Sequence, residues 1–209
     1  MEKEIKLHDG SIYRGEYKEN NGFIELSGEG HIAYPNGDRY VGEFKNGNLT
    51  GYGTYTFGDG ENHCGVFING IPNGLGLHEY NKGGIYMGQF NNGNRGGGYG
   101  LYCFPNGKIE FGLWKNNLLI EDMSWQIRTV TDFATSEFII SNYQDKNGFY
   151  LGEKMSNYTP VQGIIFYSNG EVYMGKILNS KRDGYGNLFV TDNQIVDGIW
   201  ENNIRVAEY

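Results

Sequence analysis

The stretch that determines the fold is Tyr40-Val41-Gly42-Glu43-Phe44-Lys45-Asn46-Gly47-Asn48-Leu49-Thr50-Gly51-Tyr52-Gly53-Thr54-Tyr55. Residues two apart in a β-strand share a face, so Tyr40 and Phe44 lie on one side of a first strand and Gly53 on one side of a second. Between the two strands, Asn46-Gly47 tolerates the positive φ of a tight turn. The stretch therefore predicts one β-hairpin that alternates aromatic and glycine positions.

The same hairpin pattern recurs along most of the chain. The position of Tyr40 is filled in turn by Tyr13, Tyr40, His63, Tyr86, Glu110, Tyr150, Tyr173 and Val196. Most of these positions are 23 or 24 residues apart, with a longer interval of 40 residues between Glu110 and Tyr150. A fixed period of this size predicts a stack of β-hairpin repeats.

The glycines are expected to receive the aromatic rings. A bare Cα leaves a flat patch on a strand, and a neighbouring ring that covers it restores packing which a glycine otherwise loses. We expect Tyr40 and Phe44 to lie over glycines such as Gly53 on the paired strand. The bulky residues that replace Phe44 in later units are Phe67, Phe90, Trp114, Ile177 and Trp200.

The long interval divides the chain into three segments. Residues 1–117 hold hairpin repeats, residues 118–149 form a divergent insertion or decayed repeat, and residues 150–209 hold further repeats that we expect to continue the first sheet. In the insertion, Met123, Trp125 and Ile127 alternate as in a strand, whereas the part from Thr131 to Tyr143 fits either a strand or a short helix. A decayed repeat and a partner-docking element both remain open for this segment.

Composition disfavours two classes of partner. The 209 residues include 25 acidic and 17 basic side chains, for a net charge of −8, and Lys181-Arg182 is the only adjacent basic pair. Nucleic acids and anionic lipids both need concentrated Lys and Arg, so we expect no nucleic-acid binding and disfavour a lipid surface. Because the start lacks an apolar signal core and no apolar run approaches a membrane span, we expect a cytoplasmic protein.

Sequence motifs for chemistry are missing. Cys64 and Cys103 form no CxxC pair, and the four histidines lack metal-ligand spacing. The many Gly-x-Gly pairs precede predicted strands, so they offer no helix N-terminus to a phosphate group. We therefore predict that the chain is not an enzyme and that it holds no cofactor and no metal.

The repeat resembles a known family, the MORN (membrane occupation and recognition nexus) repeat. Tyr40-Val41-Gly42-Glu43-Phe44 with Gly51-Tyr52-Gly53 carries the resemblance, and Tyr86-Met87-Gly88 with Gly98-Tyr99-Gly100 matches equally well. The resemblance implies an all-β fold, an elongated single-layer antiparallel β-meander of stacked hairpins, with the divergent insertion after the fifth unit. It also implies a scaffold or a targeting module.

The expected function is a non-catalytic scaffold that binds other proteins within a larger multi-subunit assembly, cytoskeletal or ciliary in type. A partner helix or extended peptide would lie along the aromatic face, because aromatic side chains dominate interface hot spots. The alternative is a peripheral phospholipid-binding, membrane-targeting module. The candidate anchors are Phe44, Phe67, Phe90, Trp114, Trp125, Phe138 and Trp200.

Overall fold

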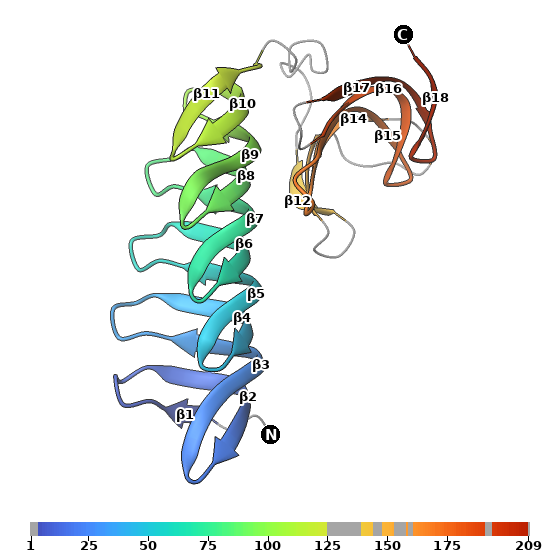
Figure 1. Cartoon of the computed structure of the whole chain (residues 1–209). Helices are drawn as coiled ribbons and strands as arrows, with labels where there is room; N and C mark the ends of the chain where they lie inside the picture. Colours follow the sequence, from blue (N-terminus) through green and yellow to red (C-terminus); the bar gives the residue numbers. More distant parts are fainter. Residues whose placement is uncertain are drawn as a thin grey trace.

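The described part of the chain forms two antiparallel sheets in which consecutive strands pair. A computed structural model describes residues 4–124, 139–143, 148–152, 158, 161–190 and 194–208. The first sheet contains 11 strands in the order β1 to β11, and the second contains seven strands in the order β12 to β18 (Figure 1). The predicted all-β meander of stacked hairpins is confirmed.

The strands follow the repeat. The first sheet consists of β1 (Glu4–Lys6), β2 (Ile12–Asn20), β3 (Phe23–Ala33), β4 (Arg39–Lys45), β5 (Asn48–Thr56), β6 (Asn62–Ile68), β7 (Ile71–Glu79), β8 (Ile85–Asn91), β9 (Asn94–Cys103), β10 (Ile109–Lys115) and β11 (Leu118–Asp122). The second consists of β12 (Ile139–Tyr143), β13 (Gly148–Gly152), β14 (Val161–Tyr167), β15 (Val172–Leu178), β16 (Lys181–Phe189), β17 (Ile195–Glu201) and β18 (Ile204–Ala207).

The predicted Asn-Gly turns close the hairpins. Asn46 and Gly47 have φ of 50° and 76°, and a two-residue turn with positive φ at both positions matches the right-handed twist of the flanking strands. The Gly47 N–H also donates a hydrogen bond to the Leu26 carbonyl of the preceding unit, at 3.0 Å. This turn thus closes its own hairpin and holds it to the preceding one.

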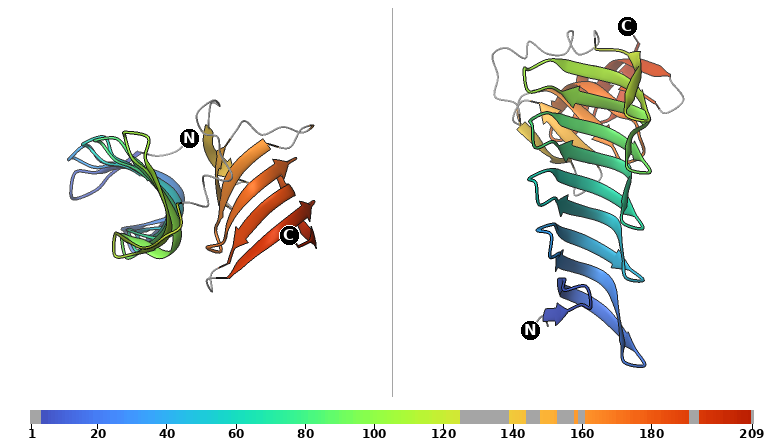
Figure 2. Two further views of the ribbon diagram at one scale, coloured as in Figure 1. Left: turned by 90° about the horizontal axis from the view of Figure 1, so that it is seen from above. Right: turned by 90° about the vertical axis from the view of Figure 1, so that its left-hand side faces the viewer.

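A row of facing glycines crosses the first sheet. Gly42 pairs with Gly30 on one side and with Gly53 on the other. A Cβ added to Gly53 would collide with the Tyr40 ring, so the ring lies directly on bare backbone as predicted. Gly30 receives Tyr13 and Gly100 receives Tyr86 in the same way. Seen along its length, the sheet has a C-shaped cross-section (Figure 2).

Phe44 is not among the atoms nearest to Gly53, which all belong to Tyr40, although its equivalent Phe90 lies 3.1 Å from a Cβ built on Gly76. The Phe44 ring stands edge-on between Tyr13 and Tyr40, with centroid distances of 5.1 and 5.3 Å. The pattern continues from Tyr40 through Phe67 to His63 at 5.3 and 5.2 Å. These edge-to-face contacts, favoured by the quadrupole of aromatic rings, run through the inner side of the first sheet. We name this set the inner ladder: Tyr13, Phe44, Tyr40, Phe67, His63, Phe90, Tyr86 and Trp114.

The repeats from Tyr150 onward do not continue the first sheet, in contrast to our expectation. They form the second sheet, which lies against the convex side of the first (Figure 2). Phe189 of β16 contacts Tyr99 and Phe111 of the first sheet at centroid distances of 5.4 and 5.2 Å. Leu77, Met87 and Leu101 join one buried cluster with Leu151, Ile164, Phe166 and Met174. The physical reason is that β7–β10 and β13–β16 both carry apolar side chains on their convex faces, which stack back to back.

The predicted insertion is only partly described. Leu118–Asp122 forms β11, which extends the first sheet beside β10, and Ile139–Tyr143 forms β12, which begins the second. The alternating stretch around Trp125 and the segment around Phe138 lie outside the described residues. The choice between a strand and a helix there stays a prediction, as does the division into segments 1–117, 118–149 and 150–209.

Candidate protein-binding groove

Most of the predicted anchors are buried inside the protein. Phe44, Phe67, Phe90, Trp114 and Trp200 expose between 2% and 5% of their surface. The premise that these rings are exposed is therefore wrong. Trp125 and Phe138 lie outside the described residues, so their part in binding stays a prediction.

The buried rings are held by partners within the protein. Four of them belong to the inner ladder, and Trp200 stands edge-on to Tyr173 at 5.8 Å in the second sheet. The Trp114 indole donates a hydrogen bond to the Gly100 carbonyl at 2.9 Å, and Trp200 donates to Gly186 at 3.0 Å. The five rings are buried and contact other rings, and the two indole N–H groups also have hydrogen-bond partners. These side chains are therefore part of the core.

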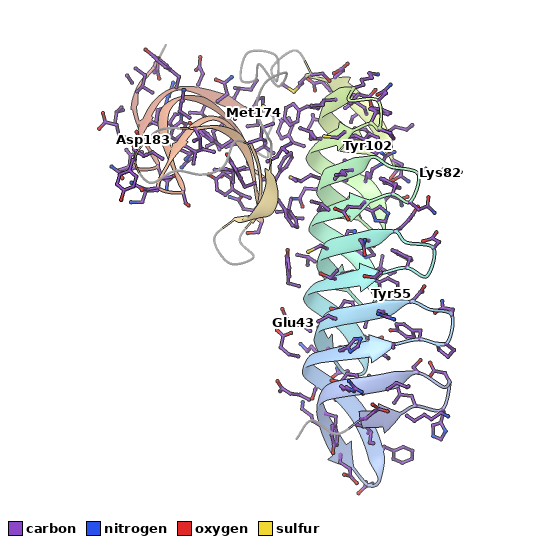
Figure 3. All side chains as sticks on the ribbon, turned by 180° about the vertical axis from the view of Figure 1, so that it is seen from behind. Glu43, Tyr55, Lys82, Tyr102, Met174 and Asp183 are labelled. Carbon is purple, nitrogen blue, oxygen red and sulfur yellow. The ribbon has the colours of Figure 1, made fainter. Side chains whose placement is uncertain are left out.

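A second set of aromatic side chains is half-buried on the concave side of the first sheet. We name it the outer aromatic row: Tyr34, Tyr55, Phe57, His78, Tyr80, Tyr102 and Phe104. Tyr55 pairs with Tyr40 across β4 and β5, and Tyr102 pairs with Tyr86, so the row lies on the same face as the inner ladder. Tyr55 and Tyr102 lie on one side of the sheet, and Glu43 points away from the opposite side (Figure 3).

The outer aromatic row is continuous through four units. Neighbouring ring centroids lie 6.1 Å apart from Tyr34 to Tyr55 and 4.6 Å from Tyr55 to Phe57. His78 follows Phe57 at 6.1 Å and contacts Tyr80 at 4.4 Å. Tyr80 then reaches Tyr102 at 5.7 Å, and Tyr102 reaches Phe104 at 4.5 Å. The row therefore offers a connected strip of aromatic surface along the first sheet.

The concave face is hollowed beside this row. A groove of about 420 Å³ in the first units is lined by the ring of Tyr34, the ring of Tyr55 and aliphatic side chains that include Leu26 and Leu49. We use the name concave groove for this hollow together with the outer aromatic row. The groove is open rather than enclosed, so it can receive a chain segment but cannot exclude water from a reaction.

Acidic side chains line one end of the concave groove. Asp9 and Asp38 lie beside Tyr34 and Tyr55 at this end. Farther along the row, Glu61 pairs with His78 at 3.2 Å and Asp59 accepts a hydrogen bond from Asn81 at 3.1 Å. The Tyr55 hydroxyl donates to Asp38 at 2.6 Å, and that hydrogen bond, with one from the Gly58 N–H, lowers the pKa of Asp38 below its usual value. The Asp38 carboxylate is therefore ionised at neutral pH and fixed in place.

Basic side chains lie at the other end. The Arg95 guanidinium is 4.9 Å from the centroid of Tyr102 and 4.8 Å from Trp114, with Tyr80 at 6.0 Å. Lys82 lies in the neighbouring turn, and Lys108 lies 5.2 Å from the Phe104 centroid while pairing with Glu110 at 2.7 Å. The concave groove thus combines an aromatic floor with charges of opposite sign at its two ends.

His63 is an unusual member of the inner ladder. It stands where other units have tyrosine, is 1% exposed, and neither ring nitrogen has a hydrogen-bond partner. Burial, assisted by the nearby His78, lowers the pKa of His63 to about 3. The imidazole is therefore neutral at physiological pH and acts as a packing ring over Gly76.

Within the described ranges, no group of His, Cys, Asp and Glu side chains has the arrangement of a metal site. The same residues include no helix that is long and apolar enough to cross a membrane. The sequence-based reasoning missed the outer aromatic row, although an aromatic-x-aromatic pair ends several second strands. Tyr55-Thr56-Phe57, His78-Glu79-Tyr80 and Tyr102-Cys103-Phe104 carry this signal.

Comparison with known proteins identifies the repeat. The family profile of the MORN repeat matches residues 40–61, 63–85 and 86–109 consecutively. A search of curated proteins found no match.

Solved structures give only distant similarity. The TCP domain of Drosophila melanogaster SAS-4, solved with a proline-rich motif of Ana2, is 12% identical and aligns with 95% of this chain and 90% of its own, with a TM-score of 0.29. The TCP10 domain of Danio rerio CPAP is 14% identical over 94% of this chain and 88% of its own, with a TM-score of 0.19. A catalytically inactive virginiamycin B lyase from Staphylococcus aureus is 12% identical over 97% and 71%, with a TM-score of 0.16. Values this low carry no information about function.

Proposed function

We propose that this chain, a MORN-repeat protein over residues 40–109, is a non-catalytic scaffold that binds a segment of another protein in its concave groove. The MORN repeats fit an interaction module. The observation that supports this proposal most is the outer aromatic row, which leaves aromatic surface half-exposed along one face. Rigid aromatic side chains bury large areas at small cost in side-chain entropy, and for this reason they dominate binding hot spots.

The shape of the groove favours a chain segment over a globular partner. A concave strip one sheet wide and several units long has the form of a site for a helix or an extended peptide. Its open geometry lacks the enclosed pocket that small-molecule sites and active sites usually have. We therefore place binding along the groove and assign no reaction to it.

The wider setting follows from the same proposal. A scaffold of this kind joins other proteins in a larger assembly, and we propose a cytoplasmic assembly of cytoskeletal or ciliary type. The alternative, a lipid-binding module, has weaker support because the net charge is −8 and the basic side chains near the groove are few.

Phage display of random 12-residue peptides against the full chain tests the proposal. Selected peptides should bind the wild type and lose at least tenfold in affinity to a Phe57→Ser, Tyr80→Ser double variant, because both rings belong to the outer aromatic row. The matched control is Phe23→Ser, since Phe23 is 78% exposed at the tip of the β2–β3 hairpin, away from the groove. Affinity is measured by fluorescence polarisation with labelled peptides.

Two outcomes would count against the proposal. If the selected peptides bind the double variant as well as they bind the wild type, the groove is not the binding site. If no peptide is selected while vesicles containing phosphoinositides bind strongly and in a salt-sensitive way, the lipid alternative replaces it. Circular dichroism and thermal melting of each variant keep loss of folding separate from loss of binding.

A further inference from the structure

The geometry points to one kind of occupant for the concave groove: an extended peptide in the polyproline II conformation that places an acidic side chain on Arg95. This inference rests on the proposed function and adds the conformation and charge of the partner. Two independent features of the groove carry it, namely its repeat distance and the environment of the Arg95 guanidinium.

The repeat distance matches a polyproline II helix. Each unit adds two strands, which advances the outer aromatic row by roughly 9.6 Å at about 4.8 Å per strand. Three residues of a polyproline II helix rise about 9.3 Å and complete one turn, so every third residue meets the next unit with the same face. Two turns of an α-helix rise about 10.8 Å, so a helix drifts out of register by about 1 Å per unit.

The rings of the row provide the matching contacts. Tyr55, His78 and Tyr102 occupy equivalent positions on β5, β7 and β9, each paired with the inner-ladder residue of its unit. Phe57, Tyr80 and Phe104 follow them at equal spacing. Grooves lined by aromatic rings are the usual sites for polyproline II segments, whose conformation is already formed before binding.

Arg95 is arranged to bind an anion. Its guanidinium packs on aromatic rings, with centroids at 4.9 Å for Tyr102 and 4.8 Å for Trp114. One of its terminal nitrogens donates to the Asn117 carbonyl at 3.0 Å. Within the part of the chain that the structure describes, no carboxylate forms an ion pair with Arg95. A guanidinium held in this way keeps donors for a carboxylate, which it can bind through two parallel hydrogen bonds.

The charge at the opposite end of the groove supports the same occupant. Asp9 and Asp38 lie beside the first units of the row, 86 and 57 residues before Arg95 in the chain. A peptide with an acidic residue at the Arg95 end and a basic residue toward Asp38 complements both ends. A peptide of opposite polarity meets like charge at each end, which disfavours it.

The second sheet offers a natural control. Arg182 lies 4.2 Å from the Trp200 centroid and donates to the Asn203 carbonyl at 2.9 Å, so it repeats the Arg95 arrangement. Beside Arg182, however, the position equivalent to Tyr102 is Leu188, and Val190 follows where Phe104 stands in the first sheet. An Arg182→Gln variant therefore loses the same stacking contact without touching the outer aromatic row.

The experiment uses the peptides selected by phage display on the full chain. We expect their apolar or proline residues to recur every third position and to be accompanied by Asp or Glu. For one such peptide, replacing the acidic residue by its amide should weaken binding about tenfold (about 1.4 kcal/mol) with the wild type and leave binding to Arg95→Gln unchanged. Arg182→Gln should bind the original peptide like the wild type, and Arg95→Lys should lie between wild type and Arg95→Gln, because it keeps the charge and loses the paired donors.

The results separate this inference from the proposed function. Peptides that need Phe57 and Tyr80 but bind Arg95→Gln at full strength overturn the acidic contact while the groove remains the binding site. Selected peptides with apolar residues at a helical period of three and four overturn the polyproline II conformation. A groove that selects no peptide overturns both the inference and the proposed function.

Discussion

At the scale of single residues, contact between a ring and bare backbone explains why this sequence needs glycine where it has it. Gly53 has no positive φ, so its requirement is steric: an added Cβ would meet the Tyr40 ring. Gly98 also lacks a positive φ, but its nearest neighbour is the flexible Gln89 side chain, with Cγ at 3.1 Å. The two glycines therefore differ in what surrounds them and not in their backbone.

Gly53→Ala should lower the free energy of unfolding by about 1–3 kcal/mol, the usual cost of forcing extra volume into a packed site. Gly98→Ala should change it by less than about 1 kcal/mol, because the Gln89 side chain can move and alanine reduces the entropy of the unfolded chain. Urea denaturation monitored by circular dichroism measures both. Equal changes in the free energy of unfolding for the two variants would show that the packing of Tyr40 does not need a bare Cα beneath the ring.

His63 gives the protein a specific weakness to acid. Its pKa is lowered to about 3 in the folded state, against about 6.5 in an unfolded chain, so between these values the unfolded state binds more protons. Stability that is present above pH 6.5 is therefore lost as the pH falls toward 3, by at most about 1.4 kcal/mol per pH unit from this group.

His63→Tyr should remove this dependence. The new hydroxyl would donate to the carbonyl three residues on, as the Tyr40 hydroxyl does to Glu43 at 3.1 Å. From pH 7 to pH 5, the wild type should lose about 2 kcal/mol more than the variant in free energy of unfolding. Urea denaturation at the two pH values checks this, and parallel losses in both proteins would contradict a neutral, buried His63.

At the scale of the elements, the inner ladder couples neighbouring hairpins. Phe67 stands edge-on to His63 of its own strand, β6, and to Tyr40 of the preceding hairpin, at 5.2 and 5.3 Å. Phe67→Leu keeps apolar bulk but removes both ring contacts, so we expect a loss of about 1–3 kcal/mol, at about 0.5–1.5 kcal/mol for each pair. Phe57→Leu in the half-exposed outer aromatic row should cost less than about 1 kcal/mol. A thermal melt of each variant measures the difference, and a Phe67→Leu variant as stable as the wild type would rule out the coupling.

Hairpins, turns and the ring-on-glycine contact could be predicted from local sequence, because each depends on residues within one unit. Asn46-Gly47 specifies its turn through φ alone, and alternation places Tyr40 and Gly53 on one face. Which aromatic side chains are exposed to solvent could not be predicted in this way. Phe44 and Tyr55 share a face, and only the curvature of the assembled sheet buries the first and leaves the second half-exposed.

The break between the two sheets also depends on more than one unit, although the sequence carries a signal for it. The residue between the tyrosine and the glycine of each triplet points to the convex face. It is Arg14 in the first full unit and Asp197 in the last, whereas Met87, Phe111 and Met174 occupy it in the middle of the chain. Val41 is 56% exposed and Met87 only 1%, so this position becomes buried where the second sheet covers the first.

At the scale of the whole molecule, back-to-back packing joins two sheets that each have their own concave face. Phe189 is fully buried and contacts Tyr99 and Phe111 of the first sheet. Trp200 is also buried, but it packs in a cluster that belongs to the second sheet alone. Substitutions of Phe189 and Trp200 can therefore distinguish the stability of the interface between the sheets from the stability of the second sheet alone.

Phe189→Ala and Trp200→Ala should each cost about 3–5 kcal/mol locally, the range for large aromatic truncations in a core. Their effects should spread differently, because the cavity left by Phe189 opens onto both sheets. Hydrogen exchange followed by mass spectrometry should show faster exchange in β8–β10 and in β13–β17 for Phe189→Ala. For Trp200→Ala, faster exchange should be confined to the second sheet, since its ring, cluster and hydrogen-bond partners among the described residues all belong to that sheet. If both variants leave β8–β10 unchanged, the two sheets open independently, and the convex faces are neighbours without being one cooperative unit.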